Sequence, residues 1–277
     1  MSLTHDKHAR MLDGYTLVYA VLSRRAGGVS VGINLCPDRR CNWQCAYCQV
    51  EGLQRGRPQP VDLCLLEQEL EHLLHALVRG EGLAALGAPD GARLVDVAFS
   101  GDGEPTLSPV FPQAVDVLAR VLGRLGLHGL LRPVLITNGS QLHRPEVVAA
   151  LSRFADLEGE VWFKLDRATQ EGFASANRVR LSPQGHLQRA RRCALLCPTW
   201  IQTCMFSEAG QPPSESEVLA YLDAVGSLPS IRGVRLYGMA RPTSNAGSQQ
   251  VTALPAVWLE QLATRLRARN IPVQVAP

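Results

Sequence analysis

The stretch CNWQCAYC, residues 41 to 48, brings three cysteines close together in the chain. Cys41, Cys45 and Cys48 are separated by three and by two residues, and Tyr47 stands just before the last of them. A loop can fold thiols with this spacing around one point. A structural zinc site takes four ligands, and so does a cluster that only carries electrons. Three thiolates on a [4Fe–4S] cluster leave one iron open, so the stretch predicts a metal centre that binds a further molecule.

Composition places few limits on function. The 277 residues, of which 46% are hydrophobic, suit one large domain or two small ones. The net charge of +3 gives little indication of a nucleic-acid partner. No apolar run reaches the ~18 residues of a membrane span, and the N-terminus lacks a signal-peptide core. We therefore expect a soluble cytoplasmic protein without a membrane partner, whose eight cysteines are free thiols or metal ligands.

Hydrophobic patterning predicts strands that alternate with helices. Two extended segments, 14–23 and 29–34, precede the cysteine loop at residues 35–49. Further strands are expected at 94–100, 132–137, 160–166, 197–206, 234–240 and 271–276, helices at 61–79, 110–125, 146–154, 183–196, 215–226 and 254–269, and loops at 52–60, 80–91 and 242–250. The alternation predicts an α/β fold with a mainly parallel sheet covered by helices. Right-handed crossovers then place the carboxyl ends of the strands on one rim, where such proteins bind ligands.

Polar motifs follow or end several of the predicted strands. They are GDGEP with Gly101, Asp102, Gly103 and Glu104, TNG with Asn138, KLD with Lys164 and Asp166, and Gln202 on the strand after KLD. Taken alone, GDGEP is an ordinary turn and TNG a helix-entry turn. Their regular position after strands predicts that these residues meet the cysteine loop at one rim.

These motifs resemble, in the same order, a bacterial subgroup of the radical S-adenosylmethionine (SAM) superfamily that is similar to the wyosine-tRNA synthase branch. The quoted segments that carry the resemblance extend over residues 17 to 245. The resemblance implies a partial (β/α)6 barrel in a single domain. Within it, residues 1–28 form an N-terminal extension, 29–240 the barrel core, and 241–277 a C-terminal helix and strand.

The resemblance also implies the cofactors and their ligands. Cys41, Cys45 and Cys48 would hold a [4Fe–4S] cluster whose open iron is chelated by SAM. A reduced cluster would cleave the S–C5′ bond of SAM to give methionine and a 5′-deoxyadenosyl radical, which abstracts hydrogen from a substrate. Contacts with SAM or its surroundings are implied for Tyr47 at the adenine, for Gly101, Asp102, Gly103 and Glu104 at the amino group, for Asn138, for Lys164 and Asp166, and for Gln202 at the ribose.

Lys164 is one of only two lysines, with Lys7, and has several interpretations. It pairs with Asp166 or Glu104 and only stabilises the barrel mouth, or it binds the carboxylate or ribose of SAM. A third interpretation makes it a catalytic Schiff-base amine. The wyosine synthases use pyruvate through a lysine and bind a second cluster through N-terminal cysteines. No cysteine precedes Cys36 here, so the resemblance carries over neither property.

The remaining cysteines allow further alternatives. Cys36 is the nearby candidate for a fourth ligand, which would make the centre a zinc knuckle. Cys193, Cys197 and Cys204 suggest a second cluster by their spacing. Because Cys197 and Cys204 are seven residues apart on one predicted strand, they point to opposite faces, and we interpret all three as buried free thiols. Cys64, among the apolar positions of helix 61–79, is interpreted as a core residue.

Three functional hypotheses follow. The first is a radical SAM enzyme that acts on a tRNA nucleoside, and the second one that acts on a peptide or small molecule, including activation of a glycyl-radical enzyme. Both need SAM and an electron donor such as flavodoxin or ferredoxin. Their substrate would enter near Arg24, Arg25 and Arg241. The third, from another class, is a non-catalytic zinc or iron–sulfur binding protein.

Overall fold

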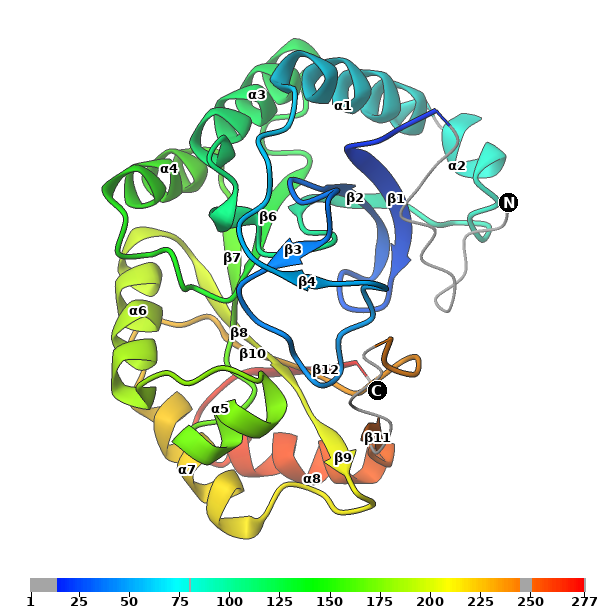
Figure 1. Ribbon diagram of the computed structural model, residues 1–277. Helices are drawn as coiled ribbons and strands as arrows, with labels where there is room; N and C mark the ends of the chain where they lie inside the picture. The colour runs from blue at the N-terminus through cyan, green and yellow to red at the C-terminus, as the bar shows by residue number, and fades with distance from the viewer. Residues whose placement is uncertain (1–13, 80, 245–250, 277) are drawn as a thin grey trace.

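The computed structural model describes residues 14–79, 81–244 and 251–276. Its main feature is a curled eight-stranded sheet, with the helices on the outside of the curl (Figure 1). In spatial order the strands are β1 (Val18–Ser23), β2 (Gly28–Ile33), β5 (Leu94–Phe99), β6 (Arg132–Thr137), β7 (Glu160–Lys164), β8 (Thr199–Cys204), β10 (Gly233–Tyr237) and β12 (Val273–Ala276). The β1–β2 pair is antiparallel and the other pairs are parallel, which confirms the predicted partial barrel.

The helices that cover the sheet agree with the hydrophobic pattern. They are α1 (Leu63–Val78), α3 (Phe111–Arg124), α4 (Pro145–Asp156), α6 (Pro183–Leu196), α7 (Glu215–Gly226) and α8 (Ala256–Arg267). Three short helices were not predicted, namely α2 (Glu81–Ala85), the 3-10 turn η1 (Pro105–Leu107) and α5 (Gln170–Ala176). Each is too short to show a helical period of its own. Of the predicted segments, residues 1–13 and 245–250 lie outside the described residues.

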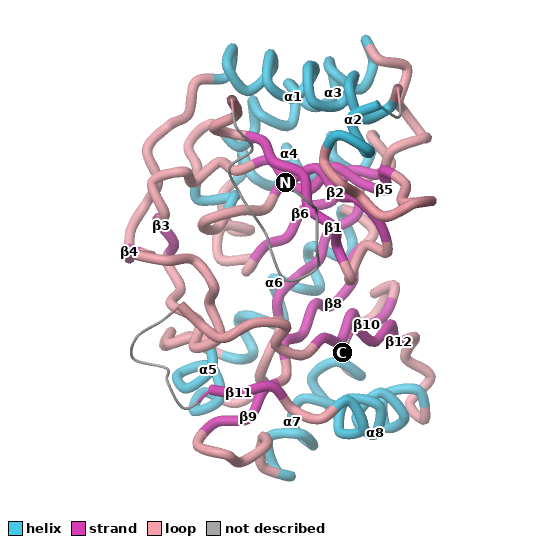
Figure 2. The backbone as a smooth tube through the Cα atoms, turned by 90° about the vertical axis from the view of Figure 1, so that its right-hand side faces the viewer, coloured by secondary structure: helices cyan, strands magenta, loops and turns pink. Residues whose placement is uncertain are grey.

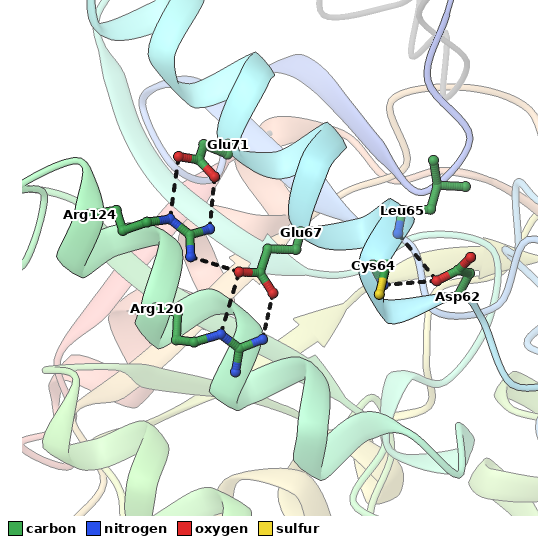
Figure 3. A network of polar contacts seen from close by, with 7 residues as sticks. All are labelled: Asp62, Cys64, Leu65, Glu67, Glu71, Arg120 and Arg124. Atoms are coloured by element: carbon green, nitrogen blue, oxygen red, sulfur yellow. Dashed lines mark hydrogen bonds and ion pairs between the residues drawn. The ribbon is translucent and has the colours of Figure 1, made fainter.

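Helix α1 shows why the pattern works and where it misleads. Asp62 caps the helix by accepting hydrogen bonds from the N–H groups of Cys64 and Leu65 (Figure 3). A leucine stripe faces the sheet, comprising Leu66, Leu70, Leu73, Leu74 and Leu77. Cys64 is exposed, so its interpretation as a core residue is wrong. Cys64 precedes Leu66 by two residues, which is about 200° around the helix and places its side chain on the opposite face.

The cysteine loop is the first part of the connection from β2 to α1, which lies beyond the strand ends on one side of the sheet (Figures 1 and 2). Within this connection, β3 (Arg40–Cys41) pairs in parallel with β4 (Gln54–Arg55). A second small ladder joins β9 (Phe206–Glu208) to β11 (Val251–Ala253) in antiparallel fashion. No helix in the described part of the chain is long and apolar enough to cross a membrane.

Glu69, on α1, binds the backbone at the start of the edge strand β1. Its carboxylate accepts hydrogen bonds from the N–H groups of Thr16 at 2.8 Å, Leu17 at 2.7 Å and Val18 at 3.2 Å. Glu69 is 7% exposed, whereas its neighbour Glu71 forms an exposed ion pair with Arg124 on α3 (Figure 3). One buried carboxylate thus satisfies three backbone donors that the sheet edge leaves without a strand partner.

We expect Glu69→Ala to lower the free energy of unfolding by about 2–4 kcal/mol, because it leaves buried donors unpaired. The matched variant Glu71→Ala should have a much smaller effect, since exposed ion pairs are screened by water and salt. Urea unfolding of both variants measures the difference. Equal destabilisation would contradict the role assigned to Glu69.

Candidate active site

A cavity of about 280 Å³ lies at the mouth of the barrel, under the cysteine loop. Residues predicted for the site reach it from separate strands, because the carboxyl ends of parallel strands meet at one rim. Its lining includes Cys41, Cys45, Tyr47, Cys48, Gly101, Gly103, Glu104, Asn138, Lys164 and Gln202. Asp102 and Asp166 lie outside this lining. The arginines predicted at the entrance, Arg24, Arg25 and Arg241, also border the cavity.

Hydrogen bonds hold the cysteine sulfurs in place. The N–H of Trp43 donates to the Cys41 Sγ at 3.4 Å, and the Asn177 amide donates to the Cys45 Sγ at 3.3 Å. Burial raises the pKa of both thiols, that of Cys45 to about 11. Because a metal binds the thiolate, loading the site must release protons from these groups.

The donors that border the cavity include the three thiols of the cysteine loop. Among the described residues, no three His, Cys, Asp or Glu side chains are grouped to hold one metal ion. Cys36 is buried outside the cavity lining, and its Sγ donates to the Glu104 carbonyl at 3.4 Å. The zinc knuckle completed by Cys36 therefore finds no support. In a [4Fe–4S] cluster each cysteine binds a different iron, so three thiols that border one cavity could hold a cluster and leave its fourth iron open.

The GDGEP segment fits tightly against the cysteine loop. A Cβ at Gly103 would lie 2.1 Å from the Arg40 carbonyl oxygen, so only glycine fits there. The Asp102 carboxylate accepts a hydrogen bond from the Asn34 amide at 2.8 Å. This segment therefore presents backbone, with little side chain, to the cavity.

The Glu104 carboxylate is buried and fully used within the protein. Burial raises its pKa. Its oxygens accept hydrogen bonds from the hydroxyls of Thr106 at 2.5 Å and Thr137 at 2.6 Å, and from the Asn138 N–H at 2.6 Å. The Asn138 Nδ2 in turn donates to the Asn42 side-chain oxygen Oδ1 at 2.9 Å. Glu104 and Asn138 thus connect the GDGEP and TNG motifs to the cysteine loop.

Asp166 forms a second buried anchor. The Tyr47 hydroxyl donates to it at 2.5 Å, the Asn177 amide at 2.7 Å, and the Cys204 N–H at 2.8 Å. Burial, and then the Asp166 carboxylate, raise the pKa of Tyr47, so this side chain stays a neutral phenol. The Tyr47 ring is thereby fixed in the cavity wall.

Lys164 lies between two tyrosines, and no carboxylate of the described residues lies at ion-pair distance from it. Its Nζ donates to the Tyr237 hydroxyl at 3.4 Å and lies 4.9 Å from the centre of the Tyr47 ring. The predicted pairs with Asp166 and Glu104 do not form, because both carboxylates are occupied by other donors. Burial opposes the charged form, but attraction to Tyr237 and Asp166 outweighs it and raises the pKa of Lys164. The side chain is an ammonium at neutral pH.

Gln202 and Tyr237 complete the inner wall. Gln202 is 0% exposed, and within the part of the chain that the structure describes neither its amide oxygen nor its amide nitrogen has a hydrogen-bond partner. An unsatisfied buried amide that borders a cavity is free to bind a ligand there. Asn177 was not predicted as a site residue. A polar residue at the end of an unpredicted helix gives no pattern by which to find it.

The other three cysteines are separated as expected. Cys193, Cys197 and Cys204 are all buried free thiols. Cys197 packs in the main core, and its Sγ donates to the Gly159 carbonyl, whereas Cys204 borders the cavity beside Tyr47. Cys197 and Cys204 therefore lie in different surroundings, and the described residues include no metal site that they share.

The chain is similar in structure to several solved proteins, among them the following three. A radical SAM methyltransferase from Sphaerobacter thermophilus aligns with a TM-score of 0.65 and 18% identity, over 96% of this chain and 71% of that one. TYW1 with a bound lysine–pyruvate adduct aligns with a TM-score of 0.58 and 12% identity, over 93% of this chain and 85% of that one. SuiB from Streptococcus suis, bound to SAM, aligns with a TM-score of 0.54 and 12% identity, over 88% of this chain and 45% of that one. The chain has the fold of the radical SAM enzymes.

Comparisons of sequence add little. No family model matches the chain. GTPase Obg from Brachyspira hyodysenteriae (strain ATCC 49526 / WA1) is 24% identical over 145 residues, and the chain spans only 18% of that protein's length. A phosphate-binding P-loop needs a Gly-Lys pair, but Lys7 follows Asp6 and Lys164 follows Phe163. The match therefore transfers no nucleotide-binding motif.

We expect Cys41→Ala to lose most of the iron that the protein binds after anaerobic reconstitution, because it removes a cavity-facing thiol. Cys36→Ala, which removes a thiol from behind the lining, should keep the wild-type iron content. Iron and sulfide analysis of both variants measures this. Loss of iron in Cys36→Ala alone would show that the ligand set is wrong.

Proposed function

We propose that this protein is a radical SAM enzyme with Cys41, Cys45 and Cys48 as the ligands of its cluster. When bound, a [4Fe–4S] cluster would supply the electron that cleaves SAM into methionine and a 5′-deoxyadenosyl radical. One observation carries the proposal. Three thiols, a backbone-rich glycine segment, the Lys164 side chain and the Gln202 amide, which lacks a hydrogen-bond partner among the described residues, all border one cavity at the barrel mouth.

The division between satisfied and unsatisfied groups supports specific roles. The Glu104 and Asp166 carboxylates are occupied, so they position Asn138 and Tyr47. The backbone at Gly101 and Gly103 is the better candidate for the amino group of SAM, because glycines allow close approach. Tyr47 would contact the adenine.

Lys164 is proposed to bind an anion, such as the carboxylate of SAM. It lacks a carboxylate partner, and a buried ammonium requires compensation. The lysine–pyruvate adduct in TYW1 offers an alternative, a Schiff base at this position. A Schiff-base amine works best with a lowered pKa, and the pKa of Lys164 is raised. The ammonium role is therefore favoured.

For the substrate we propose a tRNA nucleoside, on the resemblance to the wyosine-tRNA synthase branch. A peptide, a small molecule or a glycyl-radical enzyme is the alternative. Nucleic acid that copurifies with the protein and is modified in the assay would support the first. The electron that reduces the cluster would come from a donor such as flavodoxin or ferredoxin.

Anaerobic turnover tests the proposed activity. Protein reconstituted with iron and sulfide, reduced and given SAM should release 5′-deoxyadenosine, and the Cys41/Cys45/Cys48→Ala triple variant should release none. Chromatography with mass detection quantifies the product. Tightly bound zinc without iron and without affinity for SAM would contradict the enzyme assignment.

Lys164→Met should weaken the binding of SAM to the reconstituted protein by roughly 10- to 100-fold, the effect of a lost hydrogen bond to a charged group. Lys164→Arg keeps the charge and should retain part of the affinity. Equilibrium dialysis with labelled SAM measures both. A borohydride-stable adduct between Lys164 and pyruvate would favour the Schiff base instead.

A further inference from the structure

We propose that Asn177 is a positioning residue that sets the reduction potential of the cluster through the sulfur of Cys45. The inference rests on the proposed function, since it presumes a cluster on the three cysteines. It concerns a residue outside the cysteine, glycine and lysine motifs of the sequence. Asn177 stands at the C-terminal end of α5, far from the cysteine loop in sequence.

The Asn177 side chain joins the cysteine loop to the Asp166 anchor. Its Nδ2 donates to the Cys45 Sγ at 3.3 Å and to Asp166 Oδ2 at 2.7 Å. The same Asp166 oxygen accepts the hydrogen bond of Tyr47 at 2.5 Å. One amide group therefore connects a cluster ligand to the ring proposed to contact the adenine.

The backbone around Asn177 is docked to the same loop. The N–H of Gln44 donates to the Asn177 carbonyl at 3.3 Å, and the N–H of Ala46 donates to the Ala176 carbonyl at 2.8 Å. These bonds bracket Cys45 in the chain. The end of α5 is thus hydrogen-bonded to the loop on both sides of Cys45. The contact between the Asn177 side chain and the Cys45 thiol belongs to this larger set of hydrogen bonds.

The orientation of the amide follows from its partners. A carboxylate only accepts hydrogen bonds, so the NH₂ group must face Asp166, and this same group faces Cys45. The Asn177 Oδ1 has no hydrogen-bond partner. A flipped amide would place this oxygen against the carboxylate and the sulfur, where both contacts are repulsive.

The electrostatic consequence has a definite sign. Reduction adds negative charge to the cluster and its sulfur ligands, and an N–H donor stabilises that charge. Asn177 is 0% exposed, so water does not screen the interaction. Its hydrogen bond should favour the reduced cluster and raise the midpoint potential, which offsets the opposite effect of the nearby Asp166 carboxylate.

The test compares midpoint potentials, because activity alone would not separate this role from a structural one. Reconstituted wild type and Asn177→Leu, which keeps the side-chain volume but lacks the donor, are titrated with reductant and followed by electron paramagnetic resonance. We expect the variant to lower the equilibrium constant of reduction at least roughly threefold, about 30 mV for one electron. Asn177→Ala, which lacks the donor without adding bulk, should shift the same way.

Ser175→Ala is the matched control. It removes a hydrogen bond that the same helix α5 makes to Glu208 and leaves both Asp166 and the donor to Cys45 in place, so its potential should equal that of the wild type. Wild-type potentials in both Asn177 variants would overturn the inference, as would an equal shift in Ser175→Ala. A wild-type protein that binds no [4Fe–4S] cluster would instead overturn the proposed function itself.

Discussion

The carboxylate of Asp166 is the constraint on which the barrel mouth depends. A fully buried charge must be compensated by donors, and its three donors come from the cysteine loop, the end of α5 and the end of β8. These segments are distant in sequence, so they must converge for the charge to be tolerated. Glu104 acts in the same way on the other side, where it joins η1 and the end of β6.

The two anchored carboxylates also explain why other polar groups are left without partners. Because Asp166 and Glu104 are occupied, neither pairs with Lys164, which contacts the Tyr237 hydroxyl and the rings of Tyr47 and Tyr237. Gln202 likewise keeps both ends of its amide unsatisfied in a buried position. Satisfied groups form the frame of the cavity, and unsatisfied ones are available to a ligand that brings charge and hydrogen bonds.

Much of the fold could be predicted because its elements are long and periodic. The predicted bounds of α6, α7 and β6 equal those of the structure, and the other long elements differ by a few residues. Short elements such as α5 and β9 were missed. Seven residues make fewer than two helical turns, and three residues are too few to show the alternation of a strand. Cys64 was misplaced because apolar neighbours in sequence do not define a helix face. The Lys164 pairs were wrong because competition among donors depends on contacts between distant segments.

Sequence alone determined the alternation of strands and helices, the cysteine triad, and the order of the polar motifs after the strands. These follow from periodicity and spacing, which are local properties of the chain. Only the tertiary structure decided which carboxylates are occupied, that Cys36 lies behind the cavity lining, and that Asn177 meets Cys45. Several of those contacts join residues far apart in the chain, 68 positions for Cys36 and Glu104 and 132 for Asn177 and Cys45, which local patterns cannot specify.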